Sequence, residues 1–137
     1  IESVEKILTN KSCCFALEPN EHSLFFNKEY VISNAFMACV PYHPFFKEII
    51  QSLSINKHYN SNDKFKVVMN TTGPYMLCRV YDEYINPNDV NLISSELVSP
   101  FTKSEVIEFL KGYDNSTILN FKLKDAIAVH YYFGTWL

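Results

Sequence analysis

The sequence predicts an α/β protein. Two short apolar runs bounded by polar residues, Cys13–Leu17 and Ala126–Val129, are typical of buried strands. Between them, apolar residues recur at helical spacing over residues 45–55 and 75–84. The chain has 137 residues, of which 47% are apolar and 20% are charged, with 3 Gly, and this composition is typical of a folded domain. Because no repeat or second domain boundary is visible, we expect residues 1–137 to form a single domain.

In the first half of the chain, local patterns predict two helices and one strand. Apolar residues at helical spacing predict a helix over residues 1–8, and a polar break separates it from the strand at Cys13–Leu17. Residues 18–22 then form a loop at the carboxyl end of this strand. Pro44 suits the first turn of a helix that runs towards Ile55. We expect this helix to bury one stripe of apolar side chains: Phe46, Ile49, Ile50 and Leu53.

In the second half, turn and capping signals separate the elements. The Asn- and Ser-containing residues 56–64 are the clearest loop. A threonine cap and a first-turn proline, in Thr71-Thr72-Gly73-Pro74, predict the start of a helix. The remaining predicted elements are two short strands, a helix that ends at a glycine, and a last strand that delivers His130 to its carboxyl end: Val90–Ile93, Leu97–Val98, Lys103–Lys111 with Gly112, and Ala126–Val129.

Charge and composition narrow the classes of function. The net charge is −3 and there is no basic block, so nucleic acid is not an expected partner. The longest weakly charged stretch, residues 30–46, is interrupted by polar residues and prolines, so we expect no membrane span. With 11 Phe, 9 Tyr and 1 Trp, the chain has more rings than a small core usually holds. We therefore expect some of them to line a groove.

The four cysteines indicate the cellular compartment. Cys13, Cys14, Cys39 and Cys78 lack the paired spacing of a structural zinc site. Their flanks are apolar, which predicts buried free thiols in a reducing compartment. Because no signal peptide is visible either, we expect a cytoplasmic protein that can associate peripherally with the inner face of the membrane.

The C-terminal segment combines a strand-end histidine with a small-residue turn and the one tryptophan. His130 can ligate a divalent metal through a neutral ring nitrogen. Gly134 and Thr135 can hold phosphate oxygens, and Trp136 supplies an indole N–H donor. The alternative is a structural histidine bonded to a backbone carbonyl, with Trp136 closing the core, and composition alone favours it.

Polar residues elsewhere also allow two interpretations. The helix start at Thr72-Gly73-Pro74 can attract an anion, and its glycine lets a ligand approach closely, although a threonine-capped helix needs no ligand. Asn34, within an apolar run, is either a buried amide bonded to backbone or a ligand contact. Glu18, at the carboxyl end of a strand, either faces a ligand or is a solvated carboxylate.

Three patches, in this order and spacing, carry a resemblance to a known family: Ile32–Ala38 with His43–Phe45, Thr72-Gly73-Pro74, and Ala128–His130 with Thr135-Trp136. They resemble the sugar-binding-region glycosyltransferases with a DXD motif, which include fungal initiating mannosyltransferases and bacterial capsular polysaccharide enzymes. The resemblance implies an α/β fold of the GT-A-like, nucleotide-diphospho-sugar transferase type. We then expect its C-terminal part, a mixed sheet with flanking helices.

The resemblance also implies chemistry. Such enzymes transfer a sugar from a nucleotide-diphosphate donor with retention, and an Asp-x-Asp pair holds Mn²⁺ or Mg²⁺, which stabilises the leaving group. The chain lacks this pair, and the resemblance places it just before Ile1, so we expect a C-terminal portion whose metal site is incomplete. By resemblance, His130 is a metal ligand and the catalytic residue is unassigned, with Glu18 a candidate on the acceptor side. The implied donor-binding residues are Asn34, Thr72, Gly73, Pro74, Gly134, Thr135 and Trp136.

Three functions remain open, in order of preference. The first is a bacterial glycosyltransferase of capsular polysaccharide biosynthesis, which uses a nucleotide-diphosphate sugar and a glycan or glycolipid acceptor. The second is a non-catalytic carbohydrate-binding or interaction domain on the same scaffold, suggested by the missing Asp-x-Asp pair and the surplus of aromatic residues. The third is a metal-dependent hydrolase that uses His130 and His43.

Overall fold

The computed structural model describes residues 4–55, 59–112 and 116–132. The strands of this part form one sheet with the order β2-β1-β3, from β1 at Cys13–Leu17, β2 at Ile32–Cys39 and β3 at Asn91–Ile93. β1 pairs antiparallel with β2 and parallel with β3. The α/β class and the mixed sheet with flanking helices are therefore confirmed.

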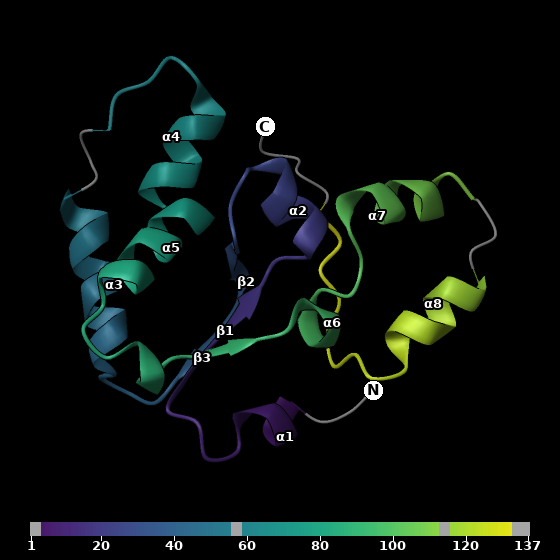
Figure 1. The fold of residues 1–137 in the computed structure, drawn as a ribbon, viewed down its shortest axis with the longest axis horizontal. Helices are drawn as coiled ribbons and strands as arrows, with labels where there is room; N and C mark the ends of the chain where they lie inside the picture. The colour runs from purple at the N-terminus through teal and green to yellow at the C-terminus, as the bar shows by residue number, and fades with distance from the viewer. Residues whose placement is uncertain (1–3, 56–58, 113–115, 133–137) are drawn as a thin grey trace.

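Helices flank this sheet on two sides (Figure 1). The group α3, α4 and α5 lies on one side, and α6, α7 and α8 lie on the other. None of the helices in the described ranges is long and apolar enough to cross a membrane. The helix bounds are α1 Val4–Leu8, α2 Asn20–Phe25, α3 Pro44–Ile55, α4 Lys64–Thr71, α5 Pro74–Glu83, α6 Ser95–Val98, α7 Lys103–Leu110 and α8 Ser116–Leu123, with a 3-10 turn at Pro87–Asp89.

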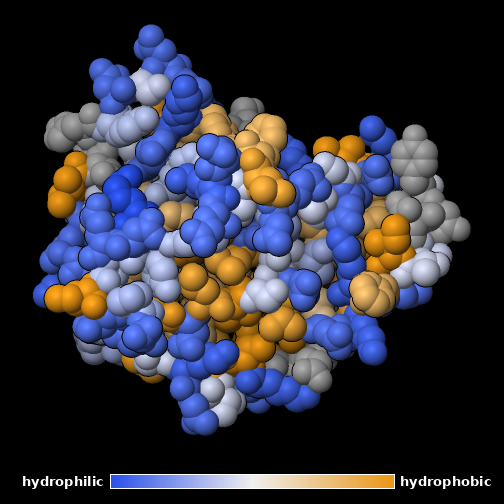
Figure 2. Space-filling view, in the orientation of Figure 1, coloured by the Kyte–Doolittle hydropathy of each residue, from blue (hydrophilic) through white to orange (hydrophobic). Residues whose placement is uncertain are grey.

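The central strand β1 supplies both faces of the core, because successive side chains of a strand point to opposite sides. Cys13 and Phe15 belong to a cluster with residues of α3 and α5, in which the Phe15 and Phe45 rings meet edge to face at 5.3 Å. Cys14 and Ala16 belong to a second cluster with residues of β3 and α6. Apolar side chains also reach the surface in the middle of the face that Figure 2 shows, where hydrophilic residues surround them.

Two predicted strands are wrong. Leu97–Val98 lies within helix α6, whose Ser94 side chain accepts a hydrogen bond from the Glu96 N–H and caps its start. Ala126–Val129 forms no strand, although Ala126 and Ile127 are buried. Instead, the N–H groups of Ile127 and Ala128 donate to the Leu97 carbonyl, at 2.8 and 3.3 Å. The apolar run packs against α6 without pairing with the sheet, and it still carries His130 towards the pocket described below.

Three helices lie where loops were expected or no element was assigned. α2 begins at Asn20, inside the predicted loop 18–22. α4 begins at Lys64, where the Asp63 side chain accepts from the Lys66 N–H at 3.2 Å and caps the helix. α8 had no predicted counterpart. These short helices have weak periodic signals, so capping and tertiary packing decide them.

Two burial predictions also need correction. In α3, Ile49 is buried as predicted, but Ile50 and Leu53 are exposed, and Phe45 supplies the fully buried contact to the core instead. All four cysteines are free, but Cys39 is exposed because it lies near the end of β2, where that strand faces solvent.

Candidate functional site

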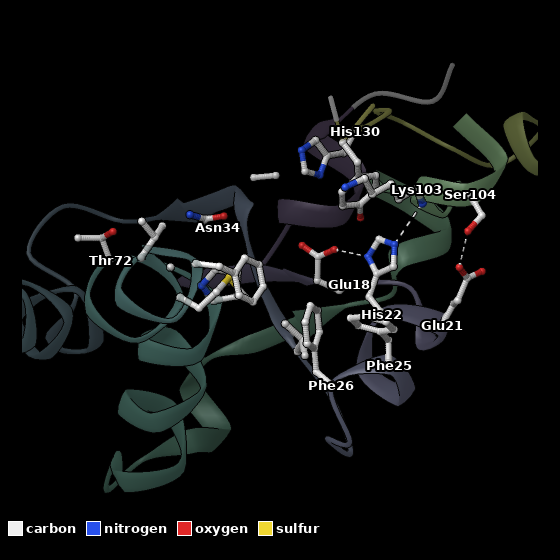
Figure 3. Close-up of a pocket in the computed structure, with 18 of the residues that line it drawn as sticks. Glu18, Glu21, His22, Phe25, Phe26, Asn34, Thr72, Lys103, Ser104 and His130 are labelled. Atoms are coloured by element: carbon white, nitrogen blue, oxygen red, sulfur yellow. Dashed lines mark hydrogen bonds and ion pairs between the residues drawn. The ribbon is translucent and has the colours of Figure 1, made fainter. Parts of the chain in front are cut away.

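A pocket of about 690 Å³ lies at the carboxyl end of β1, between α2, the start of β2, α4, the start of α7 and the C-terminal residues of the described chain. Figure 3 shows Asn34 and Thr72 towards one end of it and Glu21 and Ser104 towards the other. Every described residue to which the family resemblance assigns donor or metal binding lines this pocket, together with Glu18: Asn34, Thr72, Gly73, Pro74 and His130. Gly134, Thr135 and Trp136 lie outside the described residues.

Asn34 occupies an exposed position on β2. The strand has buried residues only at its start, and from Asn34 onward its residues are exposed or half-buried. The interpretation of Asn34 as a buried amide is therefore wrong. Its amide is accessible from the pocket and can both donate and accept hydrogen bonds.

The helix start at 72–74 differs from its prediction. Thr72 is the C-cap of α4, and Gly73 is the N-cap of α5, with no side-chain capping hydrogen bond. The N–H groups of both residues donate to the Val68 carbonyl, at 3.1 and 2.8 Å, and Pro74 has no N–H. These backbone groups are therefore used within the fold, and the Thr72 hydroxyl is the polar group that this turn can offer to an anion.

Gly73 is needed by packing between the two helices. A Cβ at this position would lie 2.9 Å from the Met69 Cα and 2.9 Å from the Val68 carbonyl oxygen. The space that was expected to admit a ligand is thus filled by the backbone of α4. Gly73 still lines the pocket, but its lack of a side chain is explained without a ligand.

The polar centre of the pocket is a hydrogen-bonded chain through His22. Glu18 follows β1, and His22 lies one helical turn further along, in α2. The His22 Nδ1 lies 2.9 Å from the Glu18 Oε2, and its Nε2 accepts from the Lys103 N–H at 3.1 Å (Figure 3). Beside these hydrogen bonds, the Ser104 hydroxyl donates to a carboxylate oxygen of Glu21 at 2.9 Å. Both links join α2 to the first turn of α7.

Glu18 is buried and ionised. Burial by itself raises the pKa of this carboxyl group, but hydrogen bonding by His22, Ser33 and Tyr132, with the charge interaction with His22, lowers the pKa below its usual value. The solvated carboxylate considered from the sequence is therefore excluded. A charged group is held inside the wall of a pocket that is otherwise mainly apolar.

His130 and Tyr132 complete this end of the pocket. Their rings lie 3.9 Å apart between centroids, and the Tyr132 ring meets the His22 ring edge to face at 4.6 Å. Tyr132 has φ of 49°, which is uncommon for a bulky residue. The Tyr132 hydroxyl is buried beside Glu18 and Ser99. The buried His130 Nδ1 has no hydrogen-bond partner among the described residues, so it is available to a ligand.

The electrostatics of His130 favour a neutral ring. Burial lowers its pKa below the usual value, Glu18 opposes this shift and His22 adds to it. Neutral imidazole is the form that ligates a metal. However, no group of three or more His, Cys, Asp or Glu side chains that could hold a metal ion occurs among the described residues. These residues alone do not fit a complete metal site, although the unpartnered Nδ1 suits a single ligand.

Aromatic side chains form much of the remaining wall, as the aromatic surplus predicted. Phe26 stacks with Phe65 at 5.8 Å between centroids and meets Tyr75 edge to face at 5.5 Å. Phe25 meets Phe26 edge to face and is 81% exposed. The pocket therefore combines apolar rings with a few polar groups, as sites for small organic ligands do.

His43 lies elsewhere. It is buried, accepts from the Phe45 N–H through Nδ1 at 3.3 Å, and its Nε2 lies 3.4 Å from the Ser12 hydroxyl. It is not among the residues that line the pocket with His130. The hydrolase that would use both histidines at one site is therefore wrong, and His43 supports the start of α3.

His22, Lys103 and Tyr132 were missed by the sequence analysis. The spacing of Glu18 and His22 is a helical i, i+4 spacing, which could have indicated the contact if residues 20–25 had been assigned to a helix. Lys103 contributes through its backbone N–H, and no sequence pattern reveals such a contact across 81 positions.

Part of the chain is similar to a known glycosyltransferase. It is 40% identical to mannosyl phosphorylinositol ceramide synthase of Saccharomyces cerevisiae over 55 residues, which are 39% of this chain and 14% of the length of that protein. No family model and no solved structure matches the chain. The similarity supports sugar transfer in general, and the GT-A-like topology stays a prediction. The relative is fungal, and nothing supports the expected bacterial, capsular role.

Proposed function

We propose that residues 1–137 form the C-terminal portion of a retaining glycosyltransferase, which transfers a sugar from a nucleotide-diphosphate donor to a glycan or glycolipid. The observation that carries the proposal is the convergence of Glu18, Asn34, Thr72 and His130 on one pocket, although they are widely separated in sequence. The partial similarity to a mannosyl phosphorylinositol ceramide synthase supports the same class of reaction. By analogy with the name of that relative, a mannosyl donor and an inositol-containing lipid acceptor are the first substrates to test.

The donor is proposed to lie over the Asn34 and Thr72 end of the pocket. The Asn34 amide is exposed there and can bond to hydroxyl groups of a sugar, and the Thr72 hydroxyl can donate to a phosphate oxygen. Fixed donors of this kind stabilise the negative charge that develops on a diphosphate leaving group.

Metal dependence is part of the proposal. A hard divalent cation, Mn²⁺ or Mg²⁺, would neutralise charge on the leaving diphosphate. Within the described chain, His130 would be its one ligand, because its buried Nδ1 has no protein partner.

The test is calorimetry of donor binding to the full-length protein that contains this chain. GDP-mannose and UDP-galactose are titrated with Mn²⁺ and then with EDTA, followed by an assay of sugar transfer. We expect binding that requires the metal, a loss of about tenfold in affinity for Asn34→Ala, and weaker metal-dependent binding for His130→Ala with an unchanged fold. Asn120→Ala, on the exposed surface of α8, is the matched control. Absence of binding by any donor at millimolar concentration contradicts the proposal.

A second candidate, a carbohydrate-binding domain without catalysis, is favoured by one observation. The described residues hold no complete metal-ligand set, yet the pocket has aromatic walls suited to sugar rings. Metal-independent binding of free sugars, together with no binding of nucleotide-diphosphate sugars, would select this candidate.

A further inference from the structure

Glu18 is a buried negative charge that no lysine or arginine in the described ranges neutralises. Its side-chain partners are His22, with Nδ1 2.9 Å from Oε2, and the hydroxyl groups of Ser33 and Tyr132. A buried carboxylate is costly unless it is fully hydrogen-bonded or meets a ligand. Since Glu18 lines the pocket, the second condition can be met by a bound molecule.

The contacts of His22 define which ring nitrogen accepts and which donates. Its Nε2 accepts a hydrogen bond from the Lys103 backbone N–H at 3.1 Å. The other nitrogen, Nδ1, then donates to the Glu18 Oε2. Glu18 keeps its full charge, and its carboxylate plane is held by a ring that is itself anchored to the first turn of α7.

The surroundings of Glu18 suit a hydroxylated ring. The Tyr132 hydroxyl is buried next to Glu18, and a hydroxyl group can both donate and accept hydrogen bonds. The aromatic wall of Phe25 and Phe26 can cover the apolar C–H face of a sugar or cyclitol, while the carboxylate accepts from its hydroxyl groups. An ionised carboxylate has about four acceptor sites, so Glu18 can accept from a ring hydroxyl in addition to its protein partners.

We propose that Glu18 binds ring hydroxyl groups of the acceptor, a sugar or cyclitol, and that His22 is the positioning residue that orients the Glu18 carboxylate. The identification of the bound ring as the acceptor rests on the proposed function. The hydroxyl-binding subsite itself rests on the contacts of Glu18, His22 and Tyr132.

The first test measures binding of free rings, without nucleotide or metal. Methyl α-mannopyranoside and myo-inositol are titrated into the full-length protein by ligand-observed NMR. We expect Glu18→Gln, which keeps the size but removes the charge, to weaken binding of at least one ring about tenfold, because hydrogen bonds to charged groups are the stronger ones. Glu108→Gln, on the exposed side of α7, is the control and keeps wild-type binding.

His22 is tested by two replacements. His22→Asn can place an amide N–H near the position of Nδ1, so we expect it to retain most ring binding, while His22→Leu loses as much as Glu18→Gln. Equal loss in both variants, or no loss in either, overturns the positioning role. If Glu18→Gln fails to fold, Phe25→Ala replaces it, because this exposed side chain contributes little to the core and its loss should still weaken ring binding.

The outcomes separate this inference from the proposed function. In the active enzyme, Glu18→Gln should raise the acceptor KM and leave the donor Kd unchanged; loss of donor binding alone overturns the acceptor assignment. If the wild-type protein binds no nucleotide-diphosphate sugar but binds rings in a Glu18-dependent way, the proposed function fails and the subsite stands. Tetramethylammonium is a cation without hydroxyl groups. If it binds and neither ring does, the pocket is a cation site, and the proposed hydroxyl-binding subsite is overturned.

Discussion

At the scale of single residues, Gly73 shows how one position serves the site through packing. It joins α4 to α5 and lies where a Cβ would meet two backbone atoms of α4 at 2.9 Å. Backbone atoms cannot turn away as a flexible side chain can, so a larger residue must separate the two helices. Because both helices contribute to the pocket wall, Gly73 maintains the shape of the pocket.

We expect Gly73→Ala to lower the free energy of unfolding by about 2 kcal/mol through overpacking. Thr72→Ala, at the neighbouring exposed position, should change it by less than about 0.5 kcal/mol. Urea unfolding followed by circular dichroism measures both values. Equal stability of Gly73→Ala and the wild type would show that α4 and α5 can move apart freely.

At the scale of elements, one carboxylate holds the start of α7 and its contact to α8. Glu105 accepts from the Thr102 N–H at 2.9 Å, while the Thr102 hydroxyl accepts from the Glu105 N–H, which together form a capping box. Glu105 also accepts from the Lys122 Nζ at 2.7 Å. Burial raises the pKa of Glu105, but the hydrogen bonds of Lys122 and Thr102 outweigh it and lower the pKa overall.

We expect Lys122→Met to destabilise the fold by about 1 kcal/mol near neutral pH, since the pair is only partly exposed. The folded pKa of Glu105 lies below its unfolded value of 4.5, so the contribution of the pair is present above that value. The contribution disappears as the pH falls through the folded pKa. Chemical unfolding at a series of pH values should therefore show that the difference in unfolding free energy between Lys122→Met and the wild type becomes smaller in acid.

Lys124→Met provides the control for this series, because Lys124 follows α8 in an exposed position. Its stability should track the wild type at every pH. A Lys122→Met difference that persists unchanged into strong acid would mean that lost packing, such as the contact of Lys122 with the Phe101 ring, causes the effect.

At the scale of the whole molecule, the accessibility of the free thiols reflects the two core clusters that pack on opposite faces of β1. Cys13 and Cys14 are buried on opposite sides of β1, and Cys78 is buried in α5, while Cys39 is exposed. Burial, with smaller contributions from Cys39, Cys14 and Asp89, raises the pKa of Cys13 to about 12. A thiol in this state is neither accessible nor ionised near neutral pH.

Iodoacetamide at about pH 8 should therefore modify Cys39 alone in the native protein, and all four thiols after unfolding in urea. Mass spectrometry of peptides identifies the modified positions, and Cys39→Ser should abolish native labelling. Rapid native labelling of Cys13 or Cys14 would contradict the central place of β1 in the sheet.

Several elements could be predicted from the sequence because their signals are local. The apolar run of β1, Pro44 at the start of α3, and Gly112 with φ of 81° after α7 each specify a backbone conformation through neighbouring residues alone. The same local reasoning selected Asn34 and His130, because polar groups beside buried apolar segments are found near pockets. Their placement at one pocket agrees with that selection, and their roles stay predictions.

The remaining features of the fold and the pocket depend on contacts between distant segments. The run Ala126–Val129 is apolar enough for a strand, but the N–H groups of Ile127 and Ala128 donate to the Leu97 carbonyl of α6, and the run pairs with no strand of the sheet. The His22 link to Lys103 and the position of Tyr132 beside Glu18 join segments distant in the chain. Such contacts depend on how helices pack, which no local pattern encodes, and they create the charged, half-enclosed centre of the pocket.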